Sequence, residues 1–108
     1  MSVREVGTPE FLQLAGRTQG KLVVVQFSAT WCGPCRRIAP AFEALAKRTP
    51  DVEFVKVYEH TSRDAMMAAG VRSMPTFHFY CGGAKVDECR GANIQAVEQR
   101  VLQHKGAA

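Results

Sequence analysis

The sequence has no long hydrophobic run and few cysteines, and both shortages narrow the class of protein. Its 108 residues contain nothing that approaches the ~20 consecutive apolar residues of a membrane span. Residues 1–6 lack the apolar stretch of a secretory signal, so we expect a cytoplasmic protein that does not associate with membranes. Four cysteines are too few for a disulfide-stapled scaffold, in which cysteine exceeds ~8–10% of residues. In a cytoplasmic chain, closely spaced cysteines indicate redox or metal chemistry.

Acidic residues are also in the minority, because 10 Asp and Glu stand against 14 Lys and Arg. The net charge of +4 does not predict nucleic-acid binding, since the basic residues are dispersed and no basic run alternates with aromatic residues. Only Arg36-Arg37 and Lys47-Arg48 are adjacent basic pairs. Arg36 and Arg37 closely follow a cysteine, where they would favour a thiolate and acidic partners. A solvated helix face is the other interpretation of this pair.

The spacing of turn residues predicts one α/β domain over residues 1–108. The expected order of elements is βαβαβαββα, which favours a mixed central sheet with helices on both faces. The valine-rich run at 22–28 is typical of a central strand buried on both faces. We expect Thr8 to cap the first helix. The predicted strands are 3–6, 22–28, 52–58, 76–81 and 85–90, and the predicted helices begin at 9, 34, 62 and 94.

The pentapeptide Trp31-Cys32-Gly33-Pro34-Cys35 lies where the central strand ends and a helix begins. Unpaired N–H groups and the positive end of the helix dipole stabilise a thiolate there, so we assign Cys32 as the attacking nucleophile. Cys35 follows one helical turn later, close enough to resolve a mixed disulfide. Gly33 permits close approach of a substrate, and Pro34 presets helical φ.

Half of a zinc site is the competing interpretation of the cysteine pair. A structural zinc ion needs four ligands, usually from a second close pair of Cys or His. No two of the remaining candidates have such a spacing, so we predict no metal. These candidates are His60, His78, Cys81, Cys89 and His104.

With these motifs in place, the chain resembles the thioredoxin family almost from end to end. The resemblance rests on Lys21–Val25, Phe27–Cys35, Met74–Phe77 and Gly91–Asn93. It implies the thioredoxin fold and a disulfide reductase and electron carrier that exchanges its dithiol with protein disulfides. Cys32 would attack, Cys35 would resolve, and the two would form the redox-active disulfide.

The same resemblance implies a substrate-binding groove beside the cysteines. Trp31 would flank the pair. Met74 and Pro75 would form the facing loop, with Pro75 in a cis peptide bond and the Met74 backbone pairing with an extended substrate. Gly91 and Ala92 would complete the groove. Without the cysteine pair, Pro75 would be read as an ordinary proline at the start of a strand.

Partners and cofactors are also implied by the resemblance. We expect protein substrates that contain disulfides, and a monomer that binds no cofactor. We also expect a thioredoxin reductase that uses NADPH to reduce the cysteine pair again after each turnover. The alternative is an adaptor domain that binds peptides or joins a larger assembly, with minor redox activity. Arg37–Phe42 is similar to the run in thioredoxin-like proteins in which such a domain precedes another one.

Gln26 is the clearest departure from the family, which carries a buried aspartate at this place, six residues before the nucleophile. That carboxylate is thought to exchange a proton with the resolving thiol. Glutamine forms hydrogen bonds but does not titrate near neutral pH, so we predict a slower resolving step. Alternatively, Gln26 is a packed strand residue and water moves the proton.

The remaining cysteines flank a predicted turn at residues 82–84. Cys81 is expected to pair near Lys85 or Val86, which would place Cys89 ~10–13 Å away along the strand. A disulfide needs Cα atoms within ~7 Å, so Cys81 and Cys89 should not bridge each other. They are interpreted as packing residues or as peripheral thiols open to modification.

Overall fold

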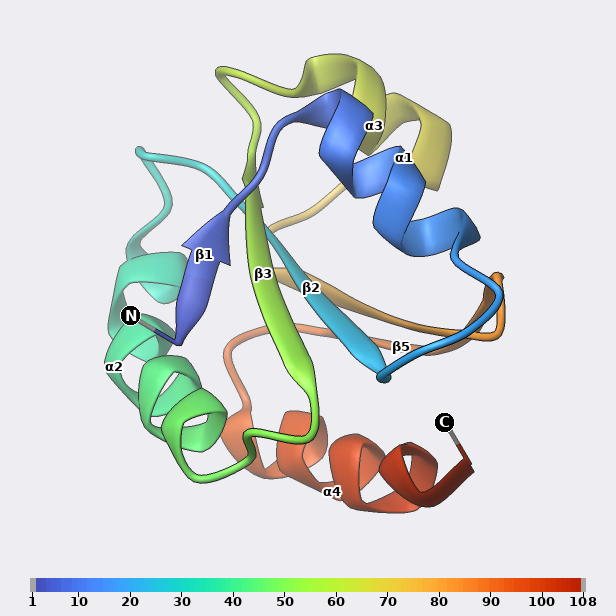
Figure 1. The fold of residues 1–108 in the computed structure, drawn as a ribbon. Helices are drawn as coiled ribbons and strands as arrows, with labels where there is room; N and C mark the ends of the chain where they lie inside the picture. Colours follow the sequence, from blue (N-terminus) through green and yellow to red (C-terminus); the bar gives the residue numbers. More distant parts are fainter. Residues whose placement is uncertain (1, 108) are drawn as a thin grey trace.

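The computed structural model describes residues 2–107, which build one sheet between two layers of helices (Figure 1). The predicted order βαβαβαββα is confirmed, and a short 3₁₀ turn, Lys105–Ala107, follows the last helix. None of the helices in the described part of the chain is long and apolar enough to cross a membrane. In chain order the elements are β1 (Val3–Glu5), α1 (Thr8–Gly16), β2 (Val23–Ser28), α2 (Gly33–Lys47), β3 (Glu53–Tyr58), α3 (Arg63–Ala69), β4 (Thr76–Cys81), β5 (Ala84–Arg90) and α4 (Ile94–His104).

The sheet is mixed, as predicted, with the strand order β1-β3-β2-β4-β5. β1 and β2 both run parallel to β3, whereas β4 is antiparallel to β2 and β5 is antiparallel to β4. The strand β2 is central, and all six of its residues are buried, which agrees with its unbroken run of valines. The carboxyl end of β2 therefore meets the start of α2 in the middle of one edge of the molecule.

Each face of the sheet carries its own hydrophobic cluster. α2 and α4 cover one face, where Phe42 and Val97 are fully buried. α1 and α3 cover the other face through Phe11 and Met66. The helices thus lie on both sides of the sheet, and α2 packs on it through Ile38, Phe42 and Leu45.

The strand β3 shows how the period-2 alternation divides side chains between the two faces. Phe54 packs in the cluster beneath α2, whereas Val55 and Val57 pack in the cluster beneath α1 and α3. Lys56 is half-buried on the same face as Phe54, with its ammonium group 5.7 Å from the centre of the Tyr58 ring.

Two local expectations are wrong. Thr8 does not cap α1, because the extended Gly7 precedes the helix and its carbonyl oxygen accepts a hydrogen bond from Phe11 N–H at 2.9 Å. Cys81 pairs with Ala84, not with Lys85 or Val86, because the hairpin turn contains only two residues. Those residues, Gly82 and Gly83, have φ of 64° and 83°, which favours glycine at both positions of a tight turn.

The second half of the hairpin prediction is confirmed. Cys89 pairs with Phe77, well along the strand from the Cys81–Ala84 pair, and no disulfide joins Cys81 to Cys89. Both cysteines are half-buried against the cluster beneath α2 and α4. Burial raises the pKa of the Cys89 thiol, which makes this cysteine a poor nucleophile.

His78 of β4 makes the stability of the fold depend on pH. Its side chain is 2% exposed, packs against the Phe27 ring, and has Nδ1 at 3.1 Å from the Tyr80 hydroxyl. Burial lowers the pKa of His78 from 6.5 to about 4. Because the unfolded chain takes up this proton first, stability falls as pH drops from about 6.5 to about 4, by a total of about 3 kcal/mol.

The variant His78→Phe is expected to flatten this part of the pH dependence, since it removes the titrating group. Urea unfolding at pH 7, 5.5 and 4.5 measures the effect. His60→Asn is the matched control, because His60 is a histidine whose side chain is exposed and not buried in the sheet. Equal slopes for wild type and His78→Phe would contradict the assignment.

Candidate active site

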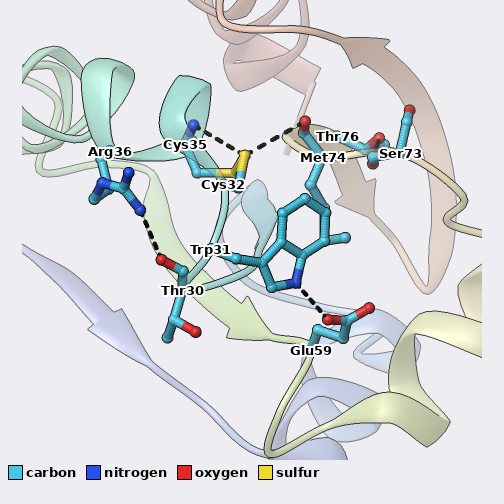
Figure 2. The surroundings of a disulfide bond; sticks show 9 residues. All are labelled: Thr30, Trp31, Cys32, Cys35, Arg36, Glu59, Ser73, Met74 and Thr76. Carbon is cyan, nitrogen blue, oxygen red and sulfur yellow. Dashed lines mark hydrogen bonds between the residues drawn. A yellow bond between two sulfur atoms is a disulfide. The ribbon is translucent and has the colours of Figure 1, made fainter.

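The two cysteines of the pentapeptide form a disulfide at the start of α2 (Figure 2). Their Cα atoms are 5.3 Å apart. Cys32 is the N-cap of the helix, in an extended conformation, and its Sγ accepts a hydrogen bond from Cys35 N–H at 3.2 Å. Pro34 lies in the first turn, where its missing N–H breaks no helical hydrogen bond.

This position gives Cys32 the electrostatic environment of a nucleophile. In the reduced protein, the Cys35 N–H and the positive end of the α2 dipole would both stabilise a negative charge on the Cys32 sulfur. Exposure does not distinguish the two cysteines, since Cys32 is 3% and Cys35 2% exposed. They differ in position, because Cys32 caps the helix whereas Cys35 lies within it.

The loop before β4 faces the disulfide from the other side. The Met74–Pro75 peptide bond is cis, as predicted, and Met74 O lies 3.6 Å from Cys32 Sγ. Pro75 O accepts a hydrogen bond from Gly91 N–H at 2.9 Å, so the loop before β4 and the loop after β5 support each other. Ala92 is exposed beside Gly91. The structure thus brings together the cysteine pair, Met74, Pro75 and Gly91.

Trp31 projects outward next to the disulfide and is 66% exposed. Its Nε1–H donates a hydrogen bond to Glu59 Oε1 at 2.9 Å, which fixes the indole over the site (Figure 2). Glu59 was not among the residues singled out from the sequence. The signal was its position directly after β3, because the carboxyl ends of the parallel strands β2 and β3 meet at the same edge of the sheet.

Gln26 lies in the middle of β2, on the sheet face that α2 covers. It is fully buried, and among residues 2–107 neither its Nε2 nor its Oε1 has a hydrogen-bond partner. Leaving such a group unpaired costs ~1–3 kcal/mol. Gln26 is flanked in register by Lys56 of β3 and Phe77 of β4. The expected carboxylate is therefore replaced by a neutral and poorly satisfied amide.

A cavity of about 210 Å³ lies behind the disulfide on the same face of the sheet. Cys35 and Lys56 line it together with Ser28 and Tyr58. None of the described residues that line this cavity carries a carboxylate. The polar side chains of the lining are hydroxyl groups and the cations of Arg36 and Lys56. A proton that leaves Cys35 on this side therefore meets no carboxylate that could accept it. Elsewhere within residues 2–107, no three His, Cys, Asp or Glu side chains are grouped to hold a metal ion.

The cysteine pair gives this chain protein-disulfide oxidoreductase activity, because two thiols that interconvert with a disulfide at a helix N-terminus can exchange with a disulfide of another protein. The chain belongs to the thioredoxin family, whose model, described as Thioredoxin, matches residues 4–103.

Individual relatives agree with this family. A thioredoxin from Ictalurus punctatus is 48% identical over 87 residues, which cover 79% of this chain and 81% of that protein. The X-ray structure of Fasciola hepatica thioredoxin is 43% identical and superposes with a TM-score of 0.88, covering 94% of this chain and 99% of that one. The thioredoxin fold expected from the sequence is confirmed.

The chain also matches part of a longer protein. A peptide-N(4)-(N-acetyl-beta-glucosaminyl)asparagine amidase from Caenorhabditis briggsae is 40% identical over 106 residues, which cover 96% of this chain but 18% of that protein. Domains similar to this one therefore also occur within larger chains.

Proposed function

We propose that this chain is a cytoplasmic disulfide reductase that acts as a single-domain monomer, with Cys32 attacking and Cys35 resolving. The observation that carries this proposal is the position of Cys32, which caps α2 with its Sγ 3.2 Å from Cys35 N and 3.6 Å from Met74 O. A substrate strand that pairs with the Met74 backbone would hold its own sulfur against Cys32 Sγ.

The reaction transfers two electrons from the protein dithiol to the substrate. The Cys32 thiolate attacks one sulfur of the substrate disulfide, and the other substrate sulfur leaves as a thiolate that takes up a proton. Cys35 then loses its proton and attacks Cys32 Sγ in the mixed disulfide. The second substrate sulfur leaves as a thiol, and Cys32 and Cys35 remain as the disulfide seen in the structure.

Each turnover oxidises the chain, so an electron donor must restore the dithiol. We propose that a flavin-containing thioredoxin reductase supplies these electrons from NADPH, and that the chain itself binds no cofactor. Membership of the family supports this donor. The exposed Trp31 and the Met74 loop would form the surface that such a reductase contacts.

A coupled assay tests the direction of the reaction and the donor together. We expect a catalytic amount of the chain to drive continuous NADPH oxidation with insulin as substrate and a panel of thioredoxin reductases as donors. Omission of insulin is the control, since only one oxidised disulfide per chain would then be consumed. The proposed donor would be wrong if the chain reduces insulin after its own reduction with dithiothreitol but none of the reductases supports NADPH oxidation.

An adaptor domain with minor redox activity is the second candidate. It is favoured by the match to 18% of the Caenorhabditis briggsae amidase, in which a similar domain is part of a larger protein. The two candidates differ in one measurement, because an adaptor with minor redox activity reduces little or no insulin even after its cysteines have been reduced with dithiothreitol.

A further inference from the structure

The arginines of this chain divide into two groups according to their ion pairs. Four arginines have no carboxylate partner among residues 2–107, namely Arg36, Arg37, Arg63 and Arg72. The remaining ones each pair with a carboxylate, and these are Arg4, Arg17, Arg48, Arg90 and Arg100.

The unpaired arginines gather around the disulfide. Arg36 follows Cys35 directly and donates a hydrogen bond to Thr30 O at 2.7 Å (Figure 2). The Arg37 guanidinium lies beside Gly33, where its Nη1 would be 3.4 Å from an added Cβ. Cationic side chains held without partners at one end of a molecule create a positive potential there, which attracts acidic partners.

Arg63 and Arg72 lie on the other side of the site, at a cavity of about 280 Å³ between α3 and the loop before β4. This cavity adjoins the disulfide through two contacts already described. Met74 lines it and has its carbonyl oxygen 3.6 Å from Cys32 Sγ, and Glu59 lines it and holds the Trp31 indole. The Met74 backbone, along which a substrate strand would pair, therefore lies beside this cavity.

The lining combines apolar and cationic groups. Met67, which is 72% exposed, and the half-buried Met74 supply flexible thioether side chains that adapt to different apolar partners, whereas Met66 is buried at the base of the cavity lining. Both guanidinium groups are exposed and free to form bidentate hydrogen bonds with carboxylates. Glu59 is the one carboxylate in the lining, and it is engaged by Trp31 Nε1–H.

We propose that this cavity is a specificity subsite for the segment of a protein substrate that flanks its disulfide, and that it selects segments with acidic side chains next to an apolar one. The proposal rests on the disulfide reductase function proposed above. The occupant is an acidic segment because the lining holds two arginines, Arg63 and Arg72, against one carboxylate. The nearby Arg36 and Arg37 add further positive charge.

Three peptides test this subsite. Each contains the same disulfide ring followed by Leu and two further residues, which are Glu-Glu, Gln-Gln or Lys-Lys. The chain is first reduced with dithiothreitol and freed of it, so that no reductase is involved, and the second-order rate of peptide reduction is measured. At low ionic strength, we expect the Glu peptide to react about tenfold faster than the Gln peptide and the Lys peptide to be slowest. Sodium chloride at about 0.5 M should remove most of the difference.

The double variant Arg63→Glu/Arg72→Glu should abolish this preference. The rate with the Glu peptide should fall about tenfold relative to the rate with the Gln peptide, so that the two peptides react at similar rates. Lys47→Glu is the control, because Lys47 is an exposed cation at the far end of α2, away from the disulfide. The proposal is overturned if wild type reduces the Glu and Gln peptides at equal rates, if the double variant slows all three peptides alike, or if Lys47→Glu has the same effect. Reduction of none of the peptides by wild type would instead refute the reductase function itself.

Discussion

Replacing Cys32 with serine is expected to lower protein-disulfide reduction by ~10³-fold or more, because no other thiolate caps α2 and faces the Met74 loop. Replacing Cys35 with serine has a different result. Cys32 still attacks, but nothing resolves the mixed disulfide, so the substrate stays covalently attached to the chain. Non-reducing electrophoresis and mass spectrometry distinguish the two outcomes after incubation with insulin.

Cys81→Ser/Cys89→Ser is the matched control for these variants. Both cysteines lie on the hairpin and pack beneath α4, so the double replacement should retain the activity of wild type within about twofold. Covalent trapping by the Cys32→Ser variant, with Cys35 as the attached residue, would reverse the assigned roles of the two active-site cysteines.

The variant Gln26→Asp is expected to accelerate the resolving step, by about tenfold near neutral pH. The new carboxylate would accept the proton of Cys35. One positioned acid or base contributes ~10²–10⁴-fold to the rate of such a step, and the gain is smaller here because water already performs part of the transfer. Burial would also raise the pKa of this carboxyl above its ordinary range, which adds a second titration to the pH–rate profile. Stopped-flow reduction of insulin by the dithiothreitol-reduced chain from pH 5 to 9 measures both effects.

Gln26→Leu separates the chemical role of this position from its packing. It removes two buried polar atoms without partners among the described residues, so we expect stability to rise by ~1–3 kcal/mol and the rate to stay within about twofold of wild type. If the aspartate brings no gain in rate although the variant is folded, proton transfer at Cys35 runs through water and our interpretation of Gln26 is wrong.

Most of the fold could be predicted from the sequence because its signals are local. The valine run of β2 indicates burial on both faces, and the alternation in β3 indicates which side chains meet each helix layer. The start of α2 follows from Pro34 and the cysteine before it. Met74 and Pro75 could be assigned to the site only through the resemblance to a family. A proline at the start of a strand is common in sheets and does not by itself indicate a functional site.

The features that were missed depend on side chains distant in sequence. Glu59 meets Trp31 because two parallel strands end together, and nothing local to either residue indicates the pairing. Arg63 and Arg72 line one cavity with Met74 only because α3 packs beside the loop before β4. The two-residue turn at the hairpin tip was also missed, because three consecutive small residues permit more than one tight turn.

The closeness of Cys32 and Cys35 in the chain also determines how oxidation affects the whole molecule. With a sequence separation of three, the disulfide closes a very short loop and restricts the unfolded chain by only about 2 kcal/mol, against about 5 kcal/mol for a loop of 100 residues. The cysteines moreover form a small cluster of their own with Ala29, apart from the two large hydrophobic clusters. The protein can therefore alternate between its two redox states while the sheet and the helices α1–α4 remain folded. The disulfide thus acts as a reactant that is reduced again after each turnover, and it contributes little as a structural cross-link.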